Sequence, residues 1–215
     1  IDKRRDKVVI DGITEKPLAI VMDGKSVLLG EVTEERSTEE WMALLQYAPN
    51  HFDKRKALNQ LKGKDTLNVL AEQLIKDKHQ IIRNAGLSVI GMDKKNEVKS
   101  MIFTDKHSST RAKALSVYER FEGEAAVPVA EKVLQKEQAY EPIKAALEVI
   151  YKHDKTKGLQ FADQLTSEKA ATLVSYLTGI FADSGDPAYL NYIEEILVIV
   201  SVYQVFNVFG KYKEL

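Results

Sequence analysis

Apolar residues recur along most of the chain at the spacing of amphipathic helices. The same order of apolar and polar positions begins at His51, returns 28 residues later at His79, and returns again after 28 residues at His107. A looser copy begins at Tyr140. Apolar positions three and four residues apart share one face of a helix. A fixed period of this size indicates stacked repeats, each unable to bury its apolar face alone.

A second helical stretch lies between successive copies. Its apolar positions are Leu67, Leu70 and Leu74 after the first copy, Val98 and Ile102 after the second, and Val129 and Val133 after the third. We therefore expect each repeat to be a hairpin of two short helices. The pattern predicts further helices over residues 156–165 and 169–181.

The last predicted helix, from Tyr189 to about Phe209, is apolar on more than one face. The terminal unit of a helical stack should carry a polar outer surface. We therefore expect residues 196–209 to be disordered, packed in a groove, or engaged in self-association.

The first 36 residues follow a different, strand-like pattern. Apolar runs at 8–10, 18–22 and 27–32 are separated by the turn-forming pairs Asp11–Gly12 and Asp23–Gly24. This predicts a small antiparallel β element over 1–36, either packed on the first helix or forming the tail of a β-sandwich. Ser37 and Glu40 stand at the two positions of a capping box, so a helix is expected to begin there. The expected domains are 1–36 and 37–215.

An acid–arginine pair recurs within the repeats. Asp77 and Arg83 are six residues apart, as are Asp105 and Arg111. Such a pair, followed by alanine and aliphatic residues, resembles the HEAT repeat, in which it forms a ladder along the stack. The resemblance implies a mostly α fold, a right-handed α-α superhelix of HEAT-like hairpins. Pro49 and Gln138 occupy the aspartate position in the first and last copies.

Composition limits the kinds of partner that the chain is expected to bind and the compartments in which it is expected to occur. The 215 residues include 31 basic and 32 acidic residues and no cysteine. Nucleic-acid binding requires a clustered basic surface, so no nucleic-acid partner is expected. The most apolar stretch, 193–209, contains Glu194 and Glu195, which are costly in a bilayer. We expect a soluble protein without a membrane partner, in the cytoplasm or the periplasm.

The histidines raise the possibility of a metal site, because three of the four occupy one repeat position. Packed helices lie about 8–10 Å apart, whereas a zinc ion requires bonds of about 2.0–2.1 Å to each imidazole. We therefore expect His51, His79 and His107 to be helix-entry residues that do not converge. His153 and Asp154 are expected to form a surface pair.

Other candidate groups have simpler explanations. Adjacent helical residues diverge by about 100°, so neither Glu39–Glu40 nor Glu194–Glu195 converges on a substrate. The lysines at 54–56 and 94–95 have acidic residues nearby in the sequence. The chain contains no H-E-x-x-H motif, P-loop or nucleophile motif. We expect no catalytic, cofactor-binding or metal-binding residue in this chain.

One region carries a more specific resemblance. Its motifs occur in a fixed order at residues 17–21, 23–24, 28–29, 38–41 and 46–49, followed by Asp53 and Arg55. This order resembles the junction between the β-sandwich and the C-terminal helical domain in zinc aminopeptidases of the aminopeptidase N family. The resemblance implies that the chain is a piece of a longer metallopeptidase, whose catalytic domain precedes Ile1.

In that family the zinc ligands and the G-x-M-E-N substrate loop lie in the catalytic domain, so the resemblance carries no site residue over to this chain. It implies zinc in the catalytic domain and none here. The helical domain would act as scaffold and lid, with the catalytic domain as its intramolecular partner and peptide substrate contacted at most indirectly.

Two other classes remain open. The β-plus-helical architecture also resembles a large transcription-initiation subunit related to these peptidases, in which the zinc motif has decayed. Alternatively, the chain is an independent HEAT-like protein-interaction scaffold. A zinc motif upstream of Ile1 would argue against the first alternative. An exposed apolar patch of more than a few hundred Å² would argue against the second.

Overall fold

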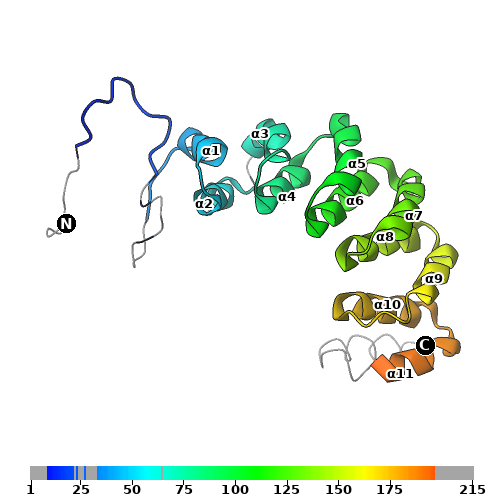
Figure 1. The fold of residues 1–215 in the computed structure, drawn as a ribbon. Helices are drawn as coiled ribbons and strands as arrows, with labels where there is room; N and C mark the ends of the chain where they lie inside the picture. The colour runs from blue at the N-terminus through cyan, green and yellow to red at the C-terminus, as the bar shows by residue number, and fades with distance from the viewer. Residues whose placement is uncertain (1–8, 22, 24–26, 28–32, 64, 197–215) are drawn as a thin grey trace. The chain divides into compact units, whose positions relative to one another are not determined.

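The computed structural model describes residues 9–21, 23, 27, 33–63 and 65–196, and these residues are mostly helical (Figure 1). The α-helices are α1 Thr38–Tyr47, α2 His51–Leu61, α3 Thr66–Leu74, α4 Gln80–Val89, α5 Lys95–Thr104, α6 Ser108–Glu122, α7 Val127–Lys136, α8 Tyr140–His153, α9 Lys155–Gln164, α10 Ala171–Ser184 and α11 Leu190–Ile196. Short 3-10 helices occupy Met92–Lys94, Gly123–Ala126 and Pro187–Tyr189. The expectation of a mostly α fold is confirmed.

The β element expected over 1–36 is not found in the described part of that segment. Residues 9–21 contain no strand, and Val9, Ile10 and Leu18 are exposed. A strand requires a hydrogen-bonding partner, and an isolated two-stranded hairpin is only marginally stable. The described residues before α1 supply no such partner. Residues 1–8, 22, 24–26 and 28–32 lie outside the described part.

The chain forms two compact units, residues 1–86 and 87–215, and the boundary falls within α4. The domain boundary expected at residue 36 lies inside unit 1. Helix α1 begins as the sequence predicts: the Ser37 hydroxyl accepts a hydrogen bond from the Glu40 amide at 3.2 Å. The Glu40 carboxylate in turn accepts from the Ser37 amide at 2.9 Å. Helix α2 begins at Asn50, whose side chain accepts from the Asp53 amide.

The core of unit 1 is built from the apolar faces predicted by the periodicity. Trp41, Leu44 and Leu45 of α1 are buried, as are Ala57 and Leu61 of α2 and the three leucines at 67, 70 and 74 of α3. Helix α4 approaches the end of α3 so closely that a Cβ at Gly86 would lie 2.7 Å from the Ile75 amide nitrogen. Glycine at this position is therefore a packing requirement.

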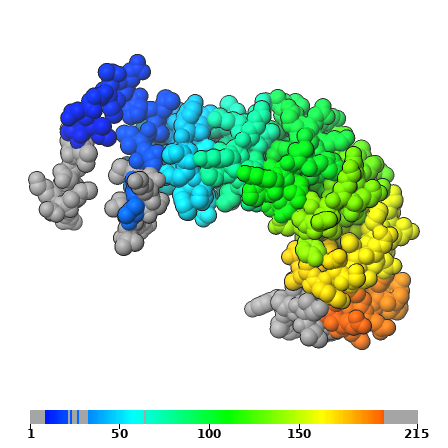
Figure 2. All heavy atoms as spheres, in the orientation of Figure 1, coloured from blue at the N-terminus to red at the C-terminus, as the bar shows by residue number. Residues whose placement is uncertain are grey.

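Unit 2 is a succession of helical hairpins. Helix α5 packs on α6, α7 on α8 and α9 on α10, and the second helices form a continuous row because α8 contacts both α6 and α10. In the space-filling view the atoms from α5 to α10 follow one another without a break, from green to orange (Figure 2). The helices expected here are present, but the sequence paired each copy with the stretch that follows it, whereas the structure packs α6 on the preceding α5 and α8 on the preceding α7.

The C-terminal half of unit 2 has its own apolar core. Leu147 of α8, Ala162 of α9 and three residues of α10, namely Leu173, Leu177 and Phe181, are fully or almost fully buried. Helix α9 lies so close to α8 at Gly158 that a Cβ there would be 2.6 Å from the Tyr151 Cα. Helix α10 ends at Gly185, which takes the left-handed conformation at φ 66°.

The last predicted helix is only partly described. Helix α11 ends at the buried Ile196, and the behaviour expected of residues 197–209 lies outside the described part. Asp186 caps the 3-10 helix Pro187–Tyr189, which lies before α11, by accepting from the Ala188 amide at 2.9 Å. Within residues 9–196 as described, no helix is both long and apolar enough to cross a membrane.

Candidate functional site

The candidate functional residues lie at the turns that precede the second helix of each hairpin. In unit 1 this turn lies between α3 and α4 and contains Asp77. The Lys54 ammonium, from α2, bonds to one Asp77 oxygen. The other Asp77 oxygen accepts from the His79 amide at 2.8 Å. We call this arrangement, Lys54, Asp77, His79 and Arg83, the first junction.

Arg83 of α4 stabilises the turn that precedes its own helix. Its guanidinium donates to the Asp77 carbonyl at 2.9 Å and to the Lys78 carbonyl at 3.1 Å. Burial by itself would raise the pKa of Asp77, but the bonds from Lys54 and from the His79 amide outweigh it and lower the pKa. The junction therefore holds a charged carboxylate at neutral pH.

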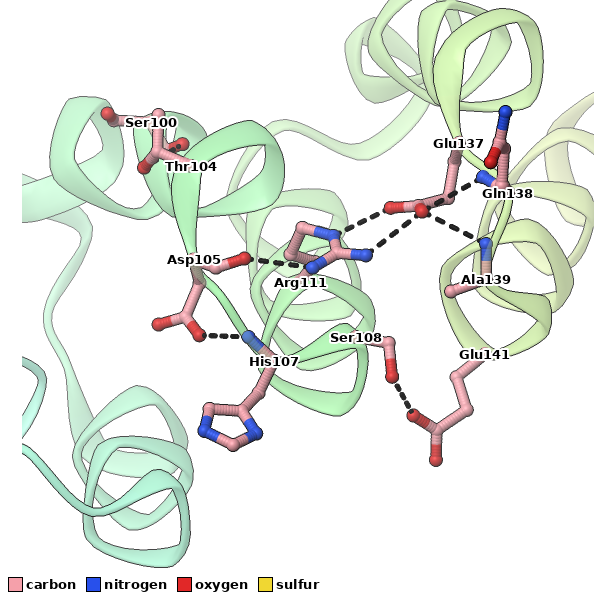
Figure 3. Close-up of polar contacts among 10 residues, drawn as sticks. All are labelled: Ser100, Thr104, Asp105, His107, Ser108, Arg111, Glu137, Gln138, Ala139 and Glu141. Atoms are coloured by element: carbon pink, nitrogen blue, oxygen red, sulfur yellow. Dashed lines mark hydrogen bonds and ion pairs between the residues drawn. The ribbon is translucent and has the colours of Figure 1, made fainter.

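In unit 2 an equivalent arrangement links α6 to the turn before α8. Arg111 donates to its own hairpin at the Asp105 carbonyl, 2.9 Å away. It also grips Glu137 with two bonds, Nε to Oε2 at 2.6 Å and Nη2 to Oε1 at 2.9 Å (Figure 3). The Asp105 side chain accepts from the His107 amide at 2.9 Å. We call Asp105, His107, Arg111 and Glu137 the second junction.

Glu137 also organises the turn that follows it. Its Oε1 accepts from the amides of Gln138 and Ala139, both at 3.0 Å. The hydrogen bonds from Arg111 lower the pKa of Glu137, burial opposes them, and the two backbone amides lower the pKa further. The pKa of Arg111 is raised by the same pair.

These contacts limit what the junctions can do chemically. A general acid must carry a proton near neutral pH, whereas the lowered pKa values keep Asp77 and Glu137 ionised. The Asp77 carboxylate accepts from Lys54 and one backbone amide, and the Glu137 carboxylate from Arg111 and two backbone amides. The junctions are therefore suited to joining neighbouring helices.

Two residues of these contacts differ from the repeat positions of the acid–arginine pair. In the first hairpin the cation that reaches the next turn is Lys54, which is buried, whereas Arg55 is exposed. Before α8 the acid is Glu137, one residue before Gln138, the position that the repeat alignment assigns to it. The longer glutamate side chain covers the shift of one residue. The presence of Glu137 next to the expected position was the feature of the sequence that could have revealed this contact.

The histidines also depart from expectation. The rings of His51 and His79 lie with their centroids 5.3 Å apart, so the expectation that equivalent histidines stay a full helix spacing apart is wrong for this pair. The distance between helix axes ignores the reach of two side chains that turn toward one another. His107 is exposed, and its ring points away from the Arg111–Glu137 pair (Figure 3).

His153 has a different partner from the one expected. It ends α8, and its Nε2 lies 2.8 Å from the Glu119 carboxylate of α6, which also accepts from Lys152 at 2.7 Å. Asp154 instead caps α9 by accepting from the Lys157 amide. The expected His153–Asp154 pair is therefore wrong: this cluster joins α6 to α8.

The remaining candidates have structural roles or lie on the surface. Glu40 belongs to the capping box of α1, and Glu194 and Glu195 are exposed on α11. The lysine-rich spots are balanced by acids: Lys56 pairs with Glu34 at 2.6 Å and Lys95 with Glu122 at 2.8 Å. In the described part of the chain, no three His, Asp or Glu residues are grouped so that they could hold a metal ion.

Comparisons with known proteins do not add to this picture. No protein-family model matches the chain, and neither the curated proteins nor the solved structures gave a significant match.

Proposed function

We propose that this chain is the non-catalytic C-terminal helical domain of a metalloaminopeptidase of the aminopeptidase N family. In this role it acts as scaffold and lid over a catalytic domain that carries the zinc and removes N-terminal residues from peptides. The catalytic domain is then its intramolecular partner, and peptide substrate is contacted at most indirectly.

The observation that carries the proposal is the order of elements. Residues 7–62 contain the motif succession that resembles the family's β-sandwich-to-helix junction, and the capping box at Ser37 begins α1 within it. Hairpins joined by acid–cation contacts follow directly. The finer description, a β-sandwich tail followed by a right-handed superhelix of HEAT-like hairpins, belongs to the same proposal, and the two junctions support its helical part.

The test is to sequence the gene upstream of Ile1 and assay the longer product. We expect H-E-x-x-H with a distant glutamate, preceded by G-x-M-E-N. The longer product should hydrolyse an aminoacyl-nitroanilide, and the 215-residue chain should not. Hydrolysis by the chain alone contradicts the proposal. An upstream region of the same architecture without the zinc ligands favours the transcription-subunit relative.

A second candidate is an independent HEAT-like protein-interaction scaffold. It is favoured by exposed aromatic side chains in unit 1: Tyr47 at the end of α1 is 67% exposed and Phe52 at the start of α2 is 59% exposed. Large aromatic residues are enriched at protein interfaces. Sedimentation of the purified chain separates the two: a soluble monomer favours the scaffold, and association through apolar surface favours the lid.

A further inference from the structure

His51 and His79 form a side-chain cluster that neither the junctions nor the proposed function explains. Both lie in unit 1, at the starts of α2 and α4, and their ring planes are inclined by 43° at a centroid separation of 5.3 Å. Two imidazoles that share one tetrahedral ion, with metal–nitrogen bonds of about 2.0–2.1 Å, have ring centroids roughly 5 Å apart. The observed separation is therefore compatible with two imidazoles on one ion, although ordinary contacts between two rings have the same separation.

A second observation points to a missing ligand. The His79 Nε2 is shielded from solvent and has no hydrogen-bond partner among the described residues. A buried polar atom without a partner calls for an explanation, of which a bound ion is one.

The neighbouring carboxylates are engaged in other bonds, so the two imidazole rings remain as the metal ligands. Asp77 is occupied by Lys54 and by the His79 amide, and the Asp53 carboxylate accepts from the Asn50 side chain at 2.7 Å. The Lys78 ammonium is directed to the Pro49 carbonyl at 3.0 Å. Such a site offers two nitrogens, and water must complete the coordination.

We propose that His51 and His79 together bind a divalent transition-metal ion that prefers imidazole, of the class of Zn²⁺, Ni²⁺ and Cu²⁺. The choice of metal follows from the donor set, because imidazole suits these ions and not Mg²⁺ or Ca²⁺. The ion would connect the first turns of α2 and α4. The proposal is independent of the proposed function.

The experiment is calorimetric titration of the 215-residue chain with Zn²⁺ and, separately, with Ni²⁺ at pH 7.5 in a non-coordinating buffer. We expect one saturable equivalent whose affinity falls more than about tenfold in His51→Gln and in His79→Gln. His107→Gln is the matched control, since it changes the same repeat position where the ring has no histidine neighbour, and His153→Gln is a second control. Both should bind as the unaltered chain does.

The control for folding is circular dichroism of every variant, with thermal unfolding in the presence and absence of Zn²⁺. Zn²⁺ should raise the Tm of the unaltered chain and of His107→Gln, but not of the two variants at the site. Absence of saturable binding, equal binding by a His51→Gln/His79→Gln double variant, or loss of binding in a control variant overturns the proposal. Zinc binding without hydrolysis leaves the proposed function unaffected.

Discussion

In unit 1 the cation that reaches the next turn is Lys54, whereas in unit 2 it is Arg111. Lysine offers a compact charge on a flexible stem, and the Lys54 ammonium bonds to one oxygen of Asp77. Arginine offers a planar fork, and Arg111 binds both oxygens of Glu137. A fork fixes the orientation of the carboxylate as well as its charge.

The acidic residues of the two junctions also differ in the number of backbone amides that they bind. Asp77 fixes a single amide, that of His79, whereas Glu137 fixes the amides of Gln138 and Ala139. The second junction therefore concentrates more bonds on one carboxylate than the first. The comparison shows that one repeat position can be filled by different side chains while the hairpins remain joined, and that the strength of each joint depends on the side chains chosen.

The largest effect is expected when the second junction is broken. Arg111→Ala removes the cation from the largely buried Glu137 carboxylate, and should cost about 3 kcal/mol of unfolding free energy. Arg111→Lys keeps the charge but loses the fork, and should recover less than half of that loss. Urea denaturation followed by circular dichroism measures both.

The matched control is Arg120→Ala, in the same helix. Arg120 is exposed and makes one long bond, 3.4 Å, to the Ser88 carbonyl, so its loss should cost less than about 1 kcal/mol. Equal losses for Arg111 and Arg120 would show that the bidentate pair adds nothing to stability.

The second prediction concerns the helix that follows the first junction. Gly86 of α4 stands 28 residues before the buried Ala114 of α6, so the two helices differ by one methyl group at this repeat position. Gly86→Ala should cost about 2 kcal/mol, because the new Cβ forces α4 away from Ile75. Thermal unfolding measures the loss.

Gly179→Ala of α10 is the control for that substitution. An added Cβ at Gly179 meets no atom within 4 Å, so alanine should be neutral or should stabilise the helix by up to about 1 kcal/mol. If Gly86→Ala is equally well tolerated, the close packing of α4 on α3 is not a requirement of the first junction.

A smaller effect is expected from Lys54. Lys54→Ala should cost about 1.5 kcal/mol, because Asp77 keeps its backbone donor but loses its cation. Lys56→Ala removes a more exposed ion pair, with Glu34, and should change stability by less than about 1 kcal/mol. If the two losses measured by urea denaturation are the same, burial of the first junction does not matter to its strength.

The smallest effect is the response of the two junctions to pH. Folding lowers the pKa of His79, so as the pH falls this histidine takes up a proton in the unfolded chain before it does so in the folded protein. The unfolding free energy is therefore highest above about pH 6.5 and decreases below that value. The stabilisation from Glu137 is present above about pH 4.5 and is lost below that value.

Unfolding free energies at pH 7.5, 5.5 and 4.0 separate the two contributions. His79→Gln should flatten the change between pH 7.5 and 5.5. An unchanged slope in His79→Gln would mean that burial of this imidazole has no energetic consequence.

Local signals in the sequence were sufficient for most of the helices. The capping box at Ser37 and the apolar spacing of α3, α5 and α7 depend on residues within a few positions of one another, so each was predictable without knowledge of the fold. The spacing of Asp105 and Arg111 singled out both residues, but not the bond that Arg111 makes to the Asp105 carbonyl.

The contacts between hairpins were less predictable, because they depend on side-chain reach. Residue spacing could not distinguish Lys54 from Arg55, since neighbouring residues point about 100° apart on a helix and only the packing of α2 decides which faces Asp77. The same limitation hid the approach of His51 to His79. The strands expected before α1 require partners that sequence periodicity cannot supply.

The double role of Glu137 ties the start of α8 to the presence of α6. The Gln138 and Ala139 amides bond to a carboxylate whose position Arg111 fixes, so local opening of α6 releases these two amide protons to solvent exchange. Where each helical hairpin contacts only its neighbours, such links make the unfolding of adjacent hairpins cooperative. Hydrogen exchange at these two amides would then report on α6, although neither residue belongs to it.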